Sequence, residues 1–125
     1  MPRPTHHPMI TWLTQTERDL PALAPSAWLS LPERERLAAL RVEKRRREWL
    51  LGRWTARRLI QRHLAESGLA CDPRDLEIVA APSGAPTIGA CQPAVQAALD
   101  GWHLTISHSQ GRALCALART PAIGA

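Results

Sequence analysis

The arginines of this sequence carry most of the chemistry that it could perform. Lysine and arginine together number 16 against 11 aspartates and glutamates, which gives a formal net charge of +5, and Lys44 is the only lysine. A guanidinium group presents paired N–H donors that match phosphate oxygens. The charge balance therefore predicts an anionic partner: a nucleic acid, a phosphorylated cofactor, an acidic protein or a membrane surface.

The histidines and hydroxyl groups form no recognisable metal site or hydrolase pair. His103 and His108 lie five residues apart on an expected strand, so their side chains would face opposite sides of it. Ser107 directly precedes His108, and adjacent strand residues point apart, so a serine nucleophile activated by histidine is not expected. The three cysteines are widely spaced and contain no CxxC pair, which favours reduced, buried thiols.

The elements that must position these residues are expected as helices first and strands afterwards. Ser30 can cap a short helix over 33–40, and a longer helix over 44–67 is closed by Gly68. The expected strands, with one helical turn at 93–100 between them, are 9–13, 76–80, 87–88, 102–107 and 113–118. This order predicts an α+β domain in which the long helix packs on a small antiparallel sheet. A flexible tail is expected over residues 1–8.

The long helix should have one buried face and several exposed arginines. The residues that recur at helical spacing and are expected to be buried are Trp49, Gly52, Ala56, Leu59, Ile60 and His63. We expect most of the following arginines to be surface charge: Arg45, Arg46, Arg57, Arg58 and Arg62. Arg-rich helices most often present such a solvated face.

Three stretches, in this order, resemble the Sfp-type 4'-phosphopantetheinyl transferase family. The first is PERER at 32–36 together with RREWLLGR at 46–53, the second is SGAP at 83–86, and the third is LTISHS at 104–109. The Ile-Ser-His-Ser strand end is the strongest of the three. Their common order and spacing make the resemblance specific, and it covers residues 30–125.

The resemblance implies both an activity and a fold. Members of this family move the phosphopantetheine arm of coenzyme A to a serine hydroxyl of a carrier protein, and adenosine 3',5'-bisphosphate is the by-product. Their fold is a pseudo-dimer of two similar α+β halves with coenzyme A in the cleft between them. By this resemblance residues 1–125 form a single domain that corresponds to the first half.

The same resemblance implies roles for individual residues in binding coenzyme A. Arg36, or Arg34 beside it, would meet the 3'-phosphate, and Ser107 with His108 would hold the adenine and 3'-phosphate region. Gly84 would let the backbone approach the nucleotide closely, because a side chain there would obstruct it. The remaining cofactor-binding candidates belong to the same three stretches and are Arg47, Arg53, Ser83, Ala85, Thr105 and Ile106.

Two features depart from the family pattern. Family members often have Lys or Arg where Ala85 stands, so one phosphate contact is missing or comes from elsewhere. Where the family has Gly-x-Asp-x-Glu, the sequence reads Ile123-Gly124-Ala125. The missing Asp and Glu would bind Mg²⁺, which neutralises the pyrophosphate as it leaves. We therefore expect no catalytic residue and no metal ligand in this chain, and no activity of the chain alone.

These expectations name the partners and leave an alternative. The resemblance implies an acidic acyl, peptidyl or aryl carrier protein, and a C-terminal half or a second chain that completes the cleft. The alternative is a non-catalytic basic module for nucleic acid or an acidic protein, although no stacking surface or glycine–basic loop is evident. No apolar run reaches the ~18 residues that a membrane span needs, and residues 1–9 lack the apolar centre of a signal peptide. We expect a cytoplasmic protein.

Overall fold

A computed structural model describes residues 9–119 of the chain. The expected tail at 1–8 and the departure at 123–125 lie outside these residues. The helices and strands are β1 (Ile10–Thr16), α1 (Leu31–Ala39), α2 (Glu43–Ala65), β2 (Leu76–Ala80), β3 (Pro86–Ala90), α3 (Pro93–Leu99), β4 (Trp102–Ser109) and β5 (Arg112–Arg119). Every expected helix and strand is present within a few residues of its predicted bounds.

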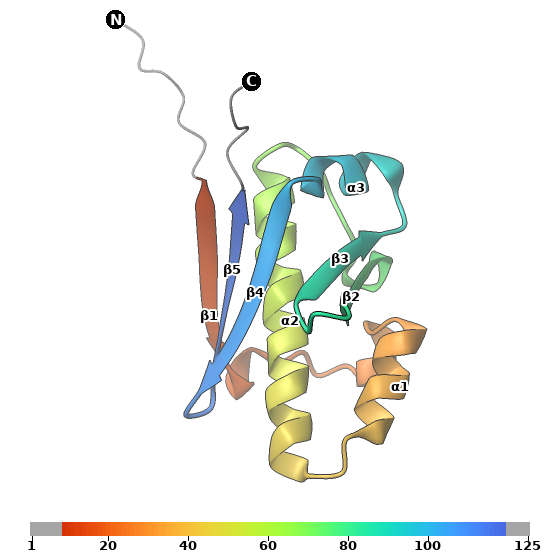
Figure 1. The fold of residues 1–125 in the computed structure, drawn as a ribbon, viewed down its shortest axis with the longest axis vertical. Coiled ribbons are helices and arrows are strands. Elements are labelled where there is room, and N and C mark those ends of the chain that lie inside the picture. Colours follow the sequence, from red (N-terminus) through yellow and green to blue (C-terminus); the bar gives the residue numbers. More distant parts are fainter. Residues whose placement is uncertain (1–8, 120–125) are drawn as a thin grey trace, which may run out of the picture.

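The expected α+β architecture is confirmed. Strands β1, β5 and β4 form an antiparallel sheet in that order, and β2 pairs with β3 in a separate hairpin. Helix α2 runs along one face of the three-stranded sheet, while α1 and the β2–β3 hairpin lie on the far side of that helix (Figure 1). No helix in the described part of the chain is long and apolar enough to cross a membrane.

The turn between β4 and β5 is two residues long. Gln110 has φ of 50° and Gly111 has φ of 76°. Two successive positive φ angles are typical of a type I′ hairpin turn, which matches the twist of the flanking strands. The loop predicted at 109–112 is therefore present, and the two strands extend to its edges.

The expected buried face of α2 is confirmed in its middle and wrong at its ends. Ala56, Leu59 and Ile60 are fully buried and join the apolar core beneath the sheet. Trp49 and His63 are only half-buried. Trp49 borders a hollow described below, and the His63 ring lies 4.2 Å from the Trp102 ring, centroid to centroid.

Two arginines expected on the surface are structural. Arg57 is 0% exposed and donates from Nη1 to Glu33 Oε2 at 2.9 Å. Arg46 is half-buried and donates from Nη1 to the carbonyls of Leu37, at 2.6 Å, and Leu40, at 3.0 Å, which joins the end of α1 to the start of α2. The prediction that most of the five arginines are surface charge is confirmed, and these two are the exceptions because each finds acceptors on a neighbouring element. Its other members, Arg45, Arg58 and Arg62, are exposed.

The cysteine prediction is correct for two thiols of three. Cys71 and Cys115 are buried and Cys91 is exposed, and all three are free. Burial raises the pKa of the Cys115 thiol to about 12. That thiol stays protonated and packs as a small apolar group in the core.

Candidate anion-binding site

Two hollows meet where α1, α2, β2 and the end of β4 come together. The larger, about 390 Å³, is bordered by Arg36, Trp49, Arg53 and Ile78, and is called here the arginine hollow. The smaller, about 120 Å³, is bordered by Arg36, Trp49, Glu48 and His108, and is called the histidine hollow. Arg36 and Trp49 border both hollows, so the two form neighbouring parts of one region.

Helix α1 places Arg36 at both hollows. Ser30 caps this helix, and Glu33 at the third helical position reaches back to the Ser30 backbone N–H at 3.3 Å. Such a reciprocal cap fixes where the helix begins. Arg36 then falls in the last turn, where a cation is favoured by the helix dipole. Arg34 is exposed and borders neither hollow, so Arg36 is the member of the predicted pair that lies at the site.

Arg53 is held at the back of the arginine hollow. Its side chain is 13% exposed, and its Nε donates to the Ile78 carbonyl at 3.2 Å. The guanidinium carbon lies 4.9 Å from the centroid of the Trp49 ring. Burial lowers the pKa of Arg53 below its usual value, and the nearby Glu33 carboxylate partly offsets this.

His108 reaches the histidine hollow because Gly52 lets β4 come close to α2. A Cβ at position 52 would lie 2.7 Å from His108 Cε1 and 2.9 Å from Ile106 Cγ2. Partial burial lowers the pKa of His108, Glu48 acts in the opposite direction and Arg53 adds to the lowering. An anion bound beside the ring would favour its protonated form.

The other members of the LTISHS stretch do not border the hollows. Ile106 is half-buried beneath Gly52. Thr105 and Ser107 alternate with Ile106 and His108 along β4, so they occupy the opposite, exposed face of the sheet. The Ser107 hydroxyl lies 3.5 Å from the Leu114 carbonyl, to which it donates.

The SGAP stretch forms the exposed turn between β2 and β3. Gly84 has φ of 91°, and its N–H donates to the Ala81 carbonyl at 2.7 Å. A Cβ there would meet nothing within 4 Å, so this structure requires glycine for the turn conformation rather than for space. Ser83 and Ala85 are exposed beside it and border neither hollow.

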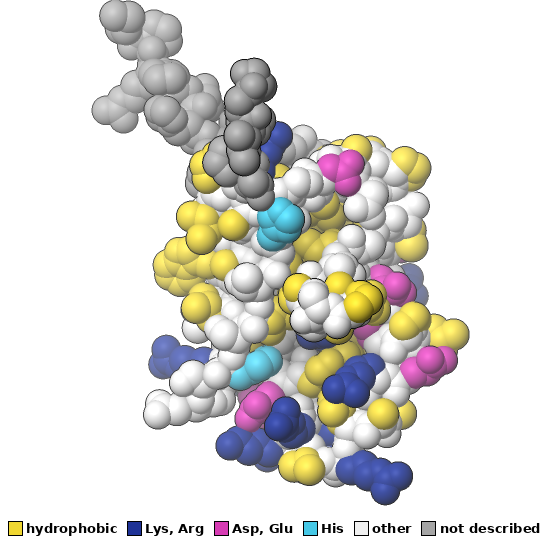
Figure 2. Space-filling model, in the orientation of Figure 1, with side chains coloured by type: hydrophobic (Ala, Val, Ile, Leu, Met, Phe, Trp, Pro, Cys, Tyr) yellow, Lys and Arg dark blue, Asp and Glu magenta, His cyan; other side chains and the backbone are white. Residues whose placement is uncertain are grey.

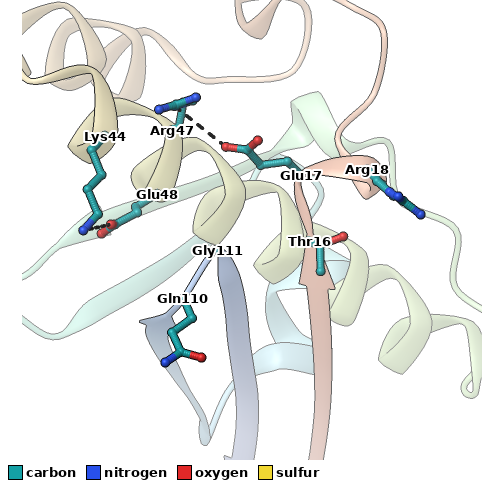
Figure 3. Close-up of a pocket in the computed structure, with 8 residues that line it drawn as sticks. All are labelled: Thr16, Glu17, Arg18, Lys44, Arg47, Glu48, Gln110 and Gly111. Carbon is teal, nitrogen blue, oxygen red and sulfur yellow. Dashed lines mark ion pairs between the residues drawn. The ribbon is translucent and has the colours of Figure 1, made fainter.

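Arg47 points into a different and larger hollow of about 700 Å³, between the end of β1, the start of α2 and the β4–β5 turn (Figure 3). Its Nε lies 3.8 Å from Glu17 Oε1, and Lys44 Nζ lies 3.9 Å from Glu48 Oε1. These cations already face carboxylates. The larger hollow therefore presents less uncompensated positive charge than its size suggests, and Arg47 is not grouped with Arg36.

Two residues of the site were not identified from the sequence. Trp49 was assigned only to the core, although a Trp and an Arg four residues apart on a helix are neighbours, which is a readable signal of the Trp49–Arg53 contact. Glu33 was given no part in the site. The Ser-x-x-Glu capping pattern could have fixed its place, but not its contact with α2.

A metal site among the described residues would need side chains that could jointly ligate an ion. Between residues 9 and 119 there is no group of three or more His, Cys, Asp or Glu side chains that could hold one. The arrangement offers cations and N–H donors for a phosphorylated molecule, and no nucleophile with an adjacent base. It is suited to binding an anion.

Comparison with known proteins agrees with this geometry at the level of the fold. No protein-family model and no curated protein sequence matches the chain. The structure is similar to that of Helicobacter pylori holo-[acyl-carrier-protein] synthase in complex with coenzyme A, with a TM-score of 0.65 and 16% identity over 90% of this chain and 100% of that one. It is also similar to the Chronobacterium ammoniagenes ACPS–CoA complex, with a TM-score of 0.64 and 16% identity over 90% and 97% of the two chains. A holo-(acyl-carrier-protein) synthase from Bacillus anthracis in complex with CoA (3',5'-ADP) gives a TM-score of 0.61 and 17% identity over 88% and 93%.

The chain has the fold of these synthases. The matches extend over nearly complete synthase chains, so this fold fits a stand-alone chain as well as the first half of a two-half enzyme.

Proposed function

We propose that this chain binds the nucleotide end of coenzyme A and belongs to a 4'-phosphopantetheinyl transferase. The observation that carries the proposal is the meeting of Arg36, Arg53 and His108 around two joined hollows. Coenzyme A carries a 3'-phosphate and a pyrophosphate, and fixed cations are what such a ligand requires. The fold shared with synthases whose structures contain coenzyme A supports the same conclusion.

Within this proposal the three side chains divide the phosphates between them. Arg36 borders both hollows and would contact the 3'-phosphate, with His108 beside it. Arg53 would serve a phosphate in the arginine hollow. The turn at Ser83 and Gly84 lies at the end of the β2–β3 hairpin, where its backbone would approach the ligand from the other side.

The cleft would be completed by a second chain or a C-terminal half that packs on the open face of the sheet. On that face Ile10 is 57% exposed, Trp12 is 61% exposed and Leu114 is 43% exposed. Thr105 and Ser107 lie on the same face, since in register Thr105 shares the partner Ala116 with Trp12 and Ser107 pairs with Leu114. A partner there would cover the apolar side chains and contact the two hydroxyl groups, which lie on the opposite face of β4 from His108.

The acceptor would be an acidic carrier protein. Lysine and arginine side chains gather at the lower end of the molecule, where α2 begins (Figure 2). The exposed cations at this end include Arg41 and Arg45, which make no ion pair among the described residues, besides Lys44 and Arg47, which lie near Glu48 and Glu17. Such a surface attracts an acidic partner and speeds its association at low salt.

Titration calorimetry with coenzyme A, and in parallel with an unrelated oligonucleotide in matched salt, tests the proposal. We expect binding of coenzyme A that weakens in Arg36→Ala. Tight oligonucleotide binding without any response to coenzyme A would instead support a nucleic-acid module and refute the proposal.

Labelling of a carrier protein tests the expectation that this chain is inactive by itself. Coenzyme A, Mg²⁺ and candidate acyl, peptidyl or aryl carriers would be incubated with the chain, and the carrier mass measured. We expect no added phosphopantetheine, because the magnesium ligands would come from the second half. Robust labelling by the chain alone would contradict this expectation.

A further inference from the structure

Arg53 is held on two sides, by the Trp49 ring and the Ile78 carbonyl, and it borders the arginine hollow. Trp49 lies one helical turn before it on α2, with the guanidinium carbon 4.9 Å from the ring centroid. The Nε of Arg53 donates to the Ile78 carbonyl on β2 at 3.2 Å. Within the described part of the chain, neither of its terminal nitrogens Nη1 and Nη2 makes a hydrogen bond. Four of the five N–H donors of this arginine are thus left for a ligand.

The neighbouring carboxylate does not use up this positive charge. Glu33 accepts from both terminal nitrogens of Arg57 and from the Ser30 hydroxyl, the last at 2.9 Å. Arg53 Nε lies 4.0 Å from Glu33 Oε2, at the outer limit of an ion pair. Glu33 and Arg57 therefore neutralise each other, and the charge of Arg53 faces the arginine hollow.

We propose that Trp49 is a positioning residue that holds the guanidinium plane of Arg53, so that Nη1 and Nη2 form a fixed fork for one phosphate group in the arginine hollow. A planar fork on an aromatic face loses little freedom when it binds, and it matches two phosphate oxygens at once. This inference rests on the proposed function.

The competing explanation is that Trp49 only packs. It contacts a small apolar cluster around Trp28, Leu29 and Leu37. Trp54 contacts the same cluster, with its ring 5.1 Å from that of Trp28, and it borders neither hollow. Trp54→Leu is therefore a matched control for the packing role of a tryptophan on this helix.

The test measures the affinity for adenosine 3',5'-bisphosphate in the full chain and in its variants. Urea titration first verifies that each variant is folded. Arg53→Lys keeps the charge and loses the fork, so we expect binding about 10-fold weaker. Trp49→Leu should weaken binding by a similar factor, while Trp49→Phe, which keeps an aromatic face, should recover most of it. In Trp49→Leu/Arg53→Lys the loss should be close to that of either single variant, because the two residues act as one unit.

The outcomes separate the inference from the proposed function. If the wild-type chain does not bind the bisphosphate at all, the proposed function fails and the inference with it. If the wild-type chain binds and the two single losses multiply, or if Trp49→Leu and Trp54→Leu lower stability alike without changing affinity, Trp49 is only a packing residue. In either of those cases the proposed function survives.

Discussion

Two arginines one turn apart on α2 have opposite surroundings. Arg57 is 0% exposed, and it donates to the Pro73 carbonyl at 3.0 Å and the Leu76 carbonyl at 2.8 Å as well as to Glu33. Among the residues that the structure describes, the Arg53 side chain makes one hydrogen bond, through Nε, and it borders the arginine hollow. At position 57 an arginine joins neighbouring elements through its hydrogen bonds, and at position 53 an arginine keeps N–H donors that could bind a ligand.

The difference comes from what each guanidinium meets across the helix. Arg57 reaches a carboxylate that a capping box has already fixed, together with the backbone that leads into β2. Both guanidinium groups also lie over a tryptophan ring, Arg57 over Trp28 and Arg53 over Trp49, but Arg53 donates to one carbonyl only. A fully buried charge is tolerated only where it is paired and hydrogen-bonded, because its desolvation is costly. A half-buried charge keeps contact with water and can remain unpaired until a ligand binds. The first region should therefore determine stability and the second affinity.

The largest effect is expected when the buried pair is broken. Arg57→Ala leaves the Glu33 carboxylate buried without its partner, and loss of one member of such a pair costs roughly 3–5 kcal/mol. Urea unfolding followed by tryptophan fluorescence measures it. Arg58→Ala, next in the chain and exposed, is the matched control and should change stability by less than about 0.5 kcal/mol. Equal effects of the two substitutions would show that the buried Arg57–Glu33 pair does not determine stability.

The next largest effect is expected for Arg36 on α1, where a substitution should lower affinity without lowering stability. Arg36→Ala should weaken binding of adenosine 3',5'-bisphosphate by roughly 10- to 100-fold, because a hydrogen bond to a charged group contributes about 1.5–3 kcal/mol. The free energy of unfolding should hardly change, since Arg36 is exposed. Arg34→Ala, two residues away on the same helix, should leave affinity unchanged. Equal losses in both variants would mean that general charge, not the hollow, holds the ligand.

A smaller effect is expected where α2 and β4 touch. In Gly52→Ala the new methyl group meets Ile106 Cγ2 and His108 Cε1, which must shift. Overpacking costs about 1–3 kcal/mol, and the better helix propensity of Ala returns about 1, so we expect a net loss of about 1 kcal/mol. Adding His108→Ala to Gly52→Ala should restore part of this stability. Affinity for the bisphosphate should fall as far as in His108→Ala alone, because the ring is displaced from the histidine hollow.

The sequence could predict the elements because local signals and fold agree. The apolar residues Ala56, Leu59 and Ile60 recur at helical spacing and face the sheet as predicted. The arginines were harder, because solvated and buried arginines have the same local pattern. Only the crossing of α1 over α2 brings Glu33, 24 residues away in the chain, against Arg57. The grouping of Arg36, Arg53 and His108 likewise depends on how three elements pack, which periodicity does not specify.

The smallest expected effect is the change of affinity with pH, which tests whether the His108 ring contacts the bound anion. Partial burial holds the pKa of His108 below its ordinary value in the free protein, and a bound phosphate would raise it. Affinity should therefore increase as the pH falls through the interval between these two pKa values, by several-fold between about pH 8 and 5. Protonation of the ligand's own phosphates acts equally on His108→Gln, so the ratio of wild-type to variant affinity isolates the ring. Because the positive charge of Arg53 also lowers the pKa of His108, Arg53→Gln should move this pH profile upward. A ratio that stays flat with pH would show that His108 does not face the anion.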